Sequence, residues 1–219
     1  MRSLVTGGTG RVGSAIAARI SAEGGTVVAA GRADGDLSRA EEARALVERA
    51  VAELGGLDLV VHAASDGFTP KRFEDVTEAE WDAAHGATAK GAFFVAQAAA
   101  PHLRSSRGVL ILIEDVAAYQ PWPSFAAHCA AKAAEAMLTR VLARALAPEV
   151  RVCGVAPGPV AVEPEQEDTR ARETLLRRVG SPDDVADAVL YLSRAQFVTG
   201  TSLVVDGGLL LETGTRANA

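Results

Sequence analysis

The stretch TGGTGRVG at residues 6–13 decides the fold of this chain. It follows a β-branched run at residues 3–6 and precedes a helical pattern from about Ser14. Glycines allow a tight turn and a close approach of the backbone to a phosphate group, and the first N–H groups of the next helix attract an anion. This context predicts the phosphate-binding turn of a dinucleotide site. A glycine-rich turn without a ligand is the alternative.

Short β-branched runs alternate with helical patterns along the rest of the chain. The runs at residues 59–61 and 109–113 are apolar on both faces, as in parallel strands that helices cover on both sides. The predicted strands are Ser3–Thr6, Thr26–Ala30, Leu57–His62, Val109–Ile113, Val150–Val155 and Ser202–Val205. We therefore expect a single α/β domain over residues 1–219, built on a Rossmann-like, doubly wound parallel sheet.

Several helix ends carry a sequence signal. The starts with capping residues are Ser38 with Glu41, Thr77 with Glu80, and Ser181 before Pro182. A further helix is expected to run from about Ser124 to about Ala147, because Pro148 disfavours a helical conformation in the residue before it.

The connection after the second predicted strand is short. That strand ends near Arg32, and Asp36 opens the next helix four residues later. A crossover to another parallel strand needs a dozen or more residues. We infer that the usual third strand and its crossover helix are shortened or missing.

Composition excludes several classes of function. The formal net charge of −6, from 22 basic and 28 acidic residues, gives no reason to expect a nucleic-acid partner. No apolar run approaches the length of a membrane span, and no signal peptide is evident at the N-terminus. Cys129 and Cys153 have no metal-ligand spacing, so we expect a cytoplasmic protein without a metal site.

A set of motifs follows one another in a characteristic order. They are Thr6-Gly7 with Gly13, His62-Ala63-Ala64-Ser65, His128-x-x-x-Lys132, Ala156-Pro157-Gly158-Pro159-Val160, Phe197-Val198-Thr199-Gly200 and Val205-Asp206-Gly207-Gly208. Together they resemble the short-chain dehydrogenase/reductase family, over nearly the whole chain. The resemblance is greatest to the branch with 3-oxoacyl-carrier-protein reductases and pteridine reductases. It implies a nicotinamide cofactor, a carbonyl or pteridine-like small-molecule substrate, and a homodimer or homotetramer.

The charges near the phosphate loop favour NADP(H). In an NAD site, an acid at the end of the second strand would hold the ribose hydroxyls, but here Arg32 stands at that end. Arg32, with Arg11 inside the loop, can bind a 2′-phosphate. Two solvated surface charges are the alternative. The residues expected to hold the cofactor are Gly7, Thr9, Gly10, Arg11, Val12, Gly13, Arg32, Asp36, Leu37, Ala63, Ala64, Thr88, Lys132, Pro157, Gly158 and Val160.

The catalytic positions of the family are largely changed. His128 stands where the family has tyrosine, and Thr88 where it has asparagine. Asp115 lies thirteen positions before His128, where most members have serine and pteridine reductases have aspartate. Lys132 is retained, one helical turn beyond His128. The resemblance therefore implies the fold and the cofactor more strongly than ordinary activity.

His128 is a candidate general acid under two conditions. It must carry a proton near neutral pH; Lys132 would lower the pKa of its imidazole, and a nearby Asp115 would raise it. It must also reach the substrate, although imidazole ends about one to two bond lengths short of a phenol oxygen. Asp115 is alternatively a strand-end acid that caps a loop.

Two functions follow. The first is an NADPH-dependent reductase with Asp115, His128 and Lys132 as catalytic residues; the second is an NADP(H)-binding sensor or partner subunit without turnover. Cys129 adjoins His128, but neighbours on a helix point about 100° apart, which argues against a Cys–His dyad. Cys129 is therefore expected to be a small buried residue. His62 is expected to be structural or near the adenosine. The charged segment at residues 160–178 covers the substrate in the resembling family.

Overall fold

The computed structural model describes residues 1–67 and 69–211, and in these residues six parallel strands form one sheet in the order β2-β1-β3-β4-β5-β6. The strands are β1 Arg2–Thr6, β2 Thr26–Ala30, β3 Leu59–His62, β4 Val109–Ile113, β5 Arg151–Pro157 and β6 Ser202–Val205. Because all neighbouring strands are parallel, their carboxyl ends lie at the same edge of the sheet. This confirms the predicted doubly wound α/β fold.

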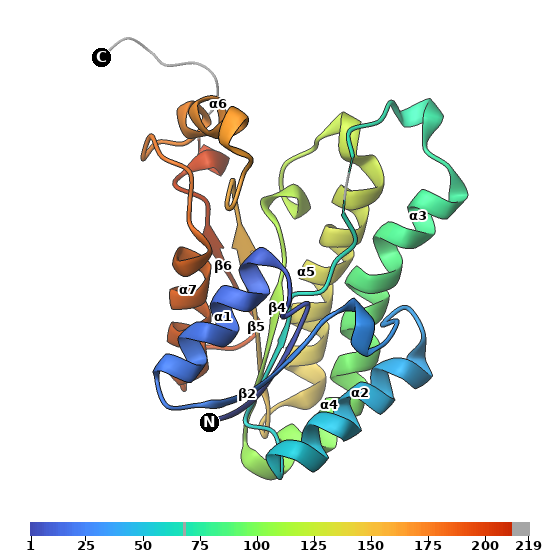
Figure 1. Cartoon of the computed structure of the whole chain (residues 1–219), viewed down its shortest axis with the longest axis vertical. Helices are drawn as coiled ribbons and strands as arrows, with labels where there is room; N and C mark the ends of the chain where they lie inside the picture. The colour runs from blue at the N-terminus through green and yellow to red at the C-terminus, as the bar shows by residue number, and fades with distance from the viewer. Residues whose placement is uncertain (68, 212–219) are drawn as a thin grey trace.

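Helices cover both faces of the sheet (Figure 1). The α-helices are α1 Arg11–Ala22, α2 Ala40–Leu54, α3 Glu78–His85, α4 Gly91–Ser106, α5 Ala126–Leu146, α6 Glu167–Glu173 and α7 Pro182–Arg194. One buried cluster joins the sheet to α1 and α7, and a second joins it to α2, α4 and α5. The sheet is therefore the middle of three layers.

Strand β4 shows why its sequence is apolar throughout. Leu110 and Leu112 pack on the side of α2, α4 and α5, whereas Ile111 and Ile113 pack on the side of α1 and α7. Successive side chains of a strand point to opposite faces, so a strand covered on both faces needs apolar residues at every position. All five residues of β4 are buried.

The short connection after β2 removes a strand, as predicted. Residues 32–34 form only a 3₁₀ turn, and α2 begins at Ala40. The chain then crosses β1 to reach β3, so that β2 is left at the edge of the sheet.

Two of the three capping predictions are confirmed. Thr77 and Ser181 each form a capping box at the start of α3 and α7. The prediction that Ser38 caps α2 with Glu41 is wrong, because Arg39 is the N-cap residue. Local hydrogen bonds explain the difference: Ser38 N donates to Asp36 Oδ1 at 2.9 Å, and Asp36 N donates to Glu42 Oε2 at 2.7 Å.

Some element bounds also differ from the prediction. Helix α1 starts at Arg11 rather than near Ser14, since Gly10 already has the extended N-cap conformation. Strand β3 starts at Leu59 rather than Leu57, and β5 extends to Pro157 rather than ending at Val155. Helix α5 is close to its predicted range and is preceded by a 3₁₀ turn at Pro123–Phe125.

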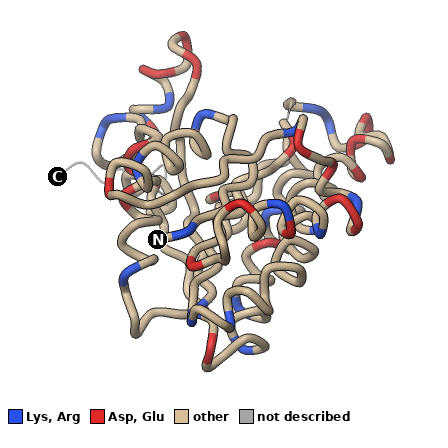
Figure 2. The backbone as a smooth tube through the Cα atoms, turned by 60° about the horizontal axis from the view of Figure 1, so that its bottom comes forward, with Lys and Arg blue, Asp and Glu red and all other residues tan. Residues whose placement is uncertain are grey.

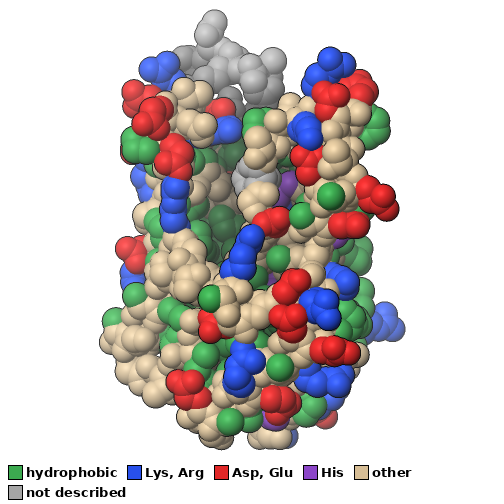
Figure 3. Space-filling model, turned by 45° about the vertical axis from the view of Figure 1, so that its right-hand side comes forward, with side chains coloured by type: hydrophobic (Ala, Val, Ile, Leu, Met, Phe, Trp, Pro, Cys, Tyr) green, Lys and Arg blue, Asp and Glu red, His purple; other side chains and the backbone are tan. Residues whose placement is uncertain are grey.

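The charges are mixed over the surface. Basic and acidic residues are interspersed along the backbone in Figure 2, and the face in Figure 3 has no broad area of one sign. Among the described residues, no helix is both long and apolar enough to cross a membrane.

Leu110→Ala should lower the free energy of unfolding by about 2–5 kcal/mol, because it leaves a cavity in the middle of the sheet. Leu110 is fully buried. Leu110→Met keeps the volume and should cost less than about 1.5 kcal/mol. Urea unfolding of both variants measures the difference; equal losses would contradict a tightly packed core at this position.

Candidate active site

The predicted site residues gather at the carboxyl edge of the sheet. The phosphate loop follows β1, Arg32 follows β2, Ala63 follows β3, Asp115 follows β4 and Gly158 follows β5. Ligands of open parallel sheets bind at this edge. The topology therefore brings residues from distant parts of the chain to one place.

The phosphate loop requires glycine at two positions. Gly7 has φ of +67°, and a Cβ there would lie 2.5 Å from the carbonyl oxygen of Ala63. A Cβ on Gly13 would collide with the carbonyl oxygen of Gly7. Helix α1 starts directly after this turn, and Gly10 offers no side-chain cap for its first N–H groups. Those groups, on Arg11, Val12 and Gly13, remain available for an anion.

The other predicted cofactor residues form the walls around this loop. A Cβ on Gly31 would meet the side chain of Thr9, so the turn after β1 lies against the residue that follows β2. Leu37 is 8% exposed and lies against Gly91 at the start of α4. A Cβ on Gly158 would meet Asp206 at 2.7 Å. The remaining members of this set are Asp36 beside Leu37, Ala64 beside Ala63, and Pro157 and Val160 on either side of Gly158.

The two arginines expected at the 2′-phosphate are both held by carboxylates. Arg32 donates to Asp66 Oδ1 at 2.7 Å. Arg11 forms an ion pair with Glu163 and donates to the carbonyl oxygen of Ala161 at 2.5 Å. A phosphate at either arginine would compete with these carboxylates.

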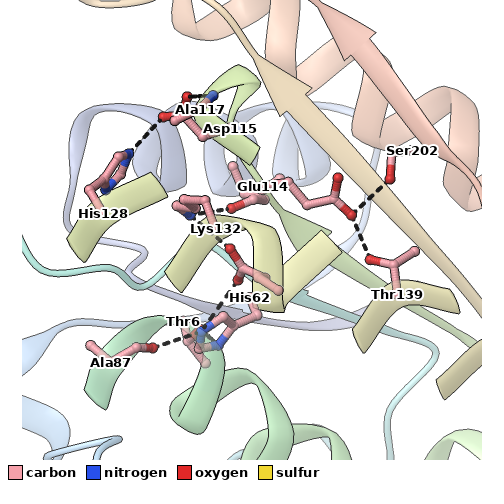
Figure 4. Close-up of polar contacts among 12 residues, drawn as sticks. Thr6, His62, Ala87, Glu114, Asp115, Ala117, His128, Lys132, Thr139 and Ser202 are labelled. Carbon is pink, nitrogen blue, oxygen red and sulfur yellow. Dashed lines mark hydrogen bonds and ion pairs between the residues drawn. The ribbon is translucent and has the colours of Figure 1, made fainter. Parts of the chain in front are cut away.

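Asp115 and His128 form the pair that the spacing indicated. The Nε2 atom of His128 lies 3.2 Å from Asp115 Oδ2 (Figure 4). The other carboxylate oxygen accepts a hydrogen bond from Ala117 N at 2.7 Å, so Asp115 also caps the 3₁₀ turn that follows β4. The reading of Asp115 as a strand-end acid that caps a loop is therefore confirmed, and the same side chain contacts His128. The His128 residue is 6% exposed.

Lys132 lies one turn further along α5 and is 5% exposed. Its ammonium group donates to the carbonyl oxygen of Ile113 at 2.7 Å and to Glu135 Oε2 at 2.8 Å. An ammonium group has three N–H donors, so these contacts leave one for a ligand.

Glu135 was not identified from the sequence. It is fully buried on α5, three residues after Lys132. Burial raises the pKa of its carboxyl group to about 7, although Lys132 acts in the opposite direction. The signal in the sequence was an acid at i+3 from Lys132, within an otherwise alanine-rich helix face.

His62 is a buried structural residue, one of the two roles expected for it. Its Nε2 atom lies 3.0 Å from the carbonyl oxygen of Ala87, and its Nδ1 atom lies 2.9 Å from Thr6 Oγ1. A carbonyl only accepts, so Nε2 carries the proton and Nδ1 accepts from Thr6. Complete burial lowers the pKa of His62 to about 4. Ala87 and the buried Thr88 lie in a π-helical turn at Gly86–Lys90, between α3 and α4.

Glu114, next to Asp115, was also missed. It is 2% exposed and accepts hydrogen bonds from Thr139 Oγ1 at 2.6 Å and Ser202 Oγ at 2.9 Å (Figure 4). It also accepts a hydrogen bond from the Tyr119 hydroxyl at 2.9 Å. A Cβ at Gly154 would overlap this carboxylate, so the acid needs glycine on the neighbouring strand. Glu114 is therefore a structural acid that ties β4 to α5 and β6.

Other sequence expectations fall outside this cluster. The prediction that Cys129 is buried is wrong: it is half-buried, and its thiol lies 3.9 Å from the carbonyl oxygen of Trp122. Among the described residues, no group of His, Cys, Asp and Glu could hold a metal ion. A cavity of about 430 Å³ opens beside β6, lined by Pro159, Leu175, Leu203 and neighbouring residues, but it includes none of Asp115, His128 and Lys132.

The arrangement fits a dinucleotide. Glycines clear the space for a pyrophosphate at the start of α1, and Lys132 retains a donor for a ribose hydroxyl. The Asp115–His128 pair supplies a proton-transfer group close to this lysine on α5. The arrangement therefore brings together a turn suited to an anion, a lysine with one N–H donor left and an acid–imidazole pair.

Comparison with known proteins agrees with this arrangement. Residues 10–210 match a family model described as enoyl-(acyl carrier protein) reductase. The chain is 35% identical to 4-formylbenzenesulfonate dehydrogenase TsaC1/TsaC2 of Comamonas testosteroni, over 94% of this chain and 96% of that protein. It is 33% identical to 3beta-hydroxysteroid dehydrogenase 1 of Eggerthella lenta, over 96% of this chain and 94% of that protein.

Solved structures give the same result. The fold matches that of 3-ketoacyl-(acyl-carrier-protein) reductase from Brucella melitensis complexed with NADH, with a TM-score of 0.88 and 26% identity. The match covers 94% of this chain and 97% of that one. Aldohexose dehydrogenase of Thermoplasma acidophilum, 23% identical with a TM-score of 0.90 over 99% of this chain and 96% of that one, has the same fold.

Glu135→Gln should make stability rise more steeply with pH. Because the pKa of Glu135 is raised to about 7, the folded state holds a proton that the unfolded state releases near pH 4.3, and stability falls as the pH rises between these values. The free energy of unfolding of E135Q, relative to the wild type, should therefore increase by up to about 1.4 kcal/mol per pH unit between about pH 5 and 6.5. Urea unfolding at a series of pH values measures this.

His62→Gln is the matched control, with the opposite sign. Since the pKa of His62 is lowered to about 4, the stability that neutral His62 contributes is lost as the pH falls from about 6.5 through 4. The stability of H62Q relative to the wild type should therefore increase as the pH falls. Parallel pH curves for the wild type and both variants would show that neither group titrates as described.

Proposed function

The chain belongs to the short-chain dehydrogenase/reductase family of oxidoreductases, and we propose that it is an NADPH-dependent enzyme that reduces a carbonyl or pteridine-like small molecule. The observation that carries this proposal is the 3.2 Å contact between Asp115 and His128, one helical turn from Lys132 and at the sheet edge that bears the phosphate loop. We propose a single dinucleotide-binding domain over residues 1–219.

The family binds a nicotinamide cofactor, and the described residues include groups suited to its pyrophosphate and its nicotinamide ribose. The turn at residues 6–13 holds the pyrophosphate at the start of α1, where N–H groups and the helix dipole favour an anion. Ala63 and Ala64 line the adjacent wall, and Lys132 donates its third N–H to the nicotinamide ribose. Thr88, Pro157, Gly158 and Val160 border the same end of the site.

The preference for NADPH rests on Arg11 and Arg32. The residues directly after β2 are Gly31 and Arg32, whereas an NAD site has there a carboxylate that holds the ribose hydroxyls. The nearest acid along the chain, Asp34, accepts a hydrogen bond from Gly31 N at 2.7 Å. A 2′-phosphate would replace Asp66 as the partner of Arg32 and Glu163 as the partner of Arg11, so each arginine would keep an anionic partner.

His128 is the proposed general acid. When bound, the reduced nicotinamide supplies a hydride to the substrate carbon. His128 then provides the proton for the substrate oxygen, and Asp115 is the hydrogen-bond acceptor and counter-charge that an imidazolium requires. Lys132, buried beside the pair, holds the cofactor and adds positive charge where the oxygen becomes negative.

The names of the relatives favour a carbonyl substrate. The Comamonas testosteroni protein is a dehydrogenase of 4-formylbenzenesulfonate, and the Eggerthella lenta protein acts on a 3beta-hydroxysteroid. We extend to this chain only the shared chemistry, interconversion of a carbonyl group and an alcohol. The segment with α6, at residues 160–178, is proposed to cover the substrate.

A cofactor-binding protein without turnover is the second candidate. The observation that favours it is the position of His128, which is 6% exposed and has its Nε2 atom directed at Asp115. Such a protein would bind NADPH and act as a redox sensor or partner subunit. For either function we propose a cytoplasmic homodimer or homotetramer, with the alanine-rich helices α4 and α5 at the interface.

Lys132→Ala should abolish reduction of carbonyl substrates and weaken NADPH binding, because the ribose loses its donor. The wild-type rate should follow the titration of one group between about pH 5 and 8, as histidine gives. His128→Asn should remove this pH dependence but keep cofactor binding. Steady-state assays with a panel of aldehydes and ketones, together with fluorescence titration of NADPH, measure both effects. A wild-type pH profile flat from about pH 5 to 9, with turnover intact, would exclude His128 as the acid.

Arg32→Ala should weaken NADPH binding about three- to tenfold and leave NADH binding nearly unchanged, because a solvent-exposed charge-assisted contact to the 2′-phosphate is lost. Asp66→Asn is the matched control: it releases Arg32 and should strengthen NADPH binding. Arg11→Ala and Glu163→Gln form the equivalent pair in the phosphate loop. An equal loss of affinity for both cofactors in R32A would contradict a 2′-phosphate contact.

A further inference from the structure

The ion contact between Lys132 and Glu135 is the least satisfied part of the candidate site. Glu135 is completely buried, and Lys132 is 5% exposed. One carboxylate oxygen of Glu135 receives Lys132 Nζ at 2.8 Å. The other, Oε1, is buried without a hydrogen-bond partner among the described residues. A buried carboxylate with one oxygen unpaired is costly, and a proton on it relieves that cost.

Among the residues that the structure describes, none donates a second hydrogen bond to Glu135. His62 approaches from β3, with its Nε2 atom 4.0 Å from Glu135 Oε1, but the proton on this nitrogen is directed to the carbonyl oxygen of Ala87. Glu114 and Asp115, which follow β4, are acids whose negative charge opposes ionisation of Glu135. Lys132 is therefore the cation that stabilises the charged form of Glu135.

Glu135 is consequently balanced between two protonation states. Desolvation and the neighbouring acids favour the neutral form, whereas the ammonium group of Lys132 favours the charged form, and the pKa of about 7 reflects this balance. Any ligand that changes the local charge around Lys132, or its contacts, must therefore shift the pKa of Glu135.

A reduced nicotinamide dinucleotide changes the local charge and the contacts of Lys132. Its phosphates bring net negative charge to the site, and its body excludes water from the cluster. A ribose hydroxyl that accepts the third N–H of Lys132 weakens the attraction of this ammonium group for Glu135. Each effect favours the neutral carboxyl group. The direction is therefore uptake of a proton from solvent as the cofactor binds.

Building on the cofactor site proposed above, we infer that Glu135 is a positioning residue that holds Lys132 in place and takes up a proton when the reduced cofactor binds. Lys132 is thereby held as a fixed ammonium donor before binding. The Lys132–Glu135 pair changes from net neutral to net positive when Glu135 takes up the proton, which balances the charge of the anionic ligand. Glu135 touches neither cofactor nor substrate; it acts through Lys132.

The test is the pH dependence of NADPH affinity, without turnover. If binding raises the pKa of Glu135 by one unit, the wild-type dissociation constant increases about tenfold from pH 6 to 9, and about half a proton is taken up per cofactor near pH 7.5. Calorimetric titration in buffers of different ionisation enthalpy counts the protons. We expect Glu135→Gln to bind NADPH with less than half of this proton uptake and a flatter pH curve.

Glu114→Gln is the matched control. It removes a second buried acid of the same cluster, one that contacts Thr139, Ser202 and Tyr119 instead of Lys132. Proton uptake should persist in this variant. If E135Q does not fold, as judged by circular dichroism, Glu135→Met provides the same comparison. A merely structural role of Glu135 would lower stability without changing the number of protons bound.

The outcomes separate this inference from the proposed function. A wild type that binds no reduced nicotinamide cofactor overturns both. A wild type that binds NADPH with the same proton uptake as E135Q overturns the role of Glu135 alone and leaves the cofactor site intact. Uptake that is lost in E135Q and retained in E114Q supports the inference.

Discussion

The buried ammonium group of Lys132 is the constraint on which the candidate site depends. A charge that is 5% exposed needs compensating oxygens, and this one has the carbonyl oxygen of Ile113 and the carboxylate of Glu135. Glu135 in turn needs a position on α5 that faces the sheet, and there it meets His62 from β3 at 4.0 Å. The requirement to neutralise one charge thus accounts for a buried polar cluster between the end of β4 and the π-helical turn at Gly86–Lys90.

The same edge of the sheet carries both halves of the site because all six described strands are parallel. Close approach is the second constraint there. Gly7 and Gly13 leave the backbone compact against Ala63, which frees the start of α1 for an anion. Gly154 serves a different purpose, since it leaves room on β5 for the carboxylate of Glu114. Glycine therefore provides space for a ligand at one position and for a buried acid at another.

The absence of a third strand between β2 and α2 changes the side of the site near Arg32, whereas the side near Lys132 is complete. The chain passes from Arg32 to Asp36 within a short turn, and Leu37 still reaches Gly91 beside the π-helical turn. Two ion pairs connect the loops that follow the strands at this edge: Arg32 with Asp66, and Arg11 with Glu163. The polar cluster around Lys132 lies at the other side of β1 and does not depend on the missing strand.

The sequence by itself determined the order of strands and helices, the doubly covered sheet, the missing crossover and the phosphate turn, because each depends on local periodicity, chain length or glycine. It also indicated Asp115 and His128 as partners from their spacing in the resembling family, and the 3.2 Å contact agrees. Sequence reasoning failed at Ser38, where the side chain of Asp36 competes for the local donors. Only the tertiary structure decided the roles of Glu114, Glu135 and His62. An acid can be a solvated charge or a group held beside a buried lysine. Its burial and its partner decide between the two, and both are supplied by strands and helices far apart in the chain.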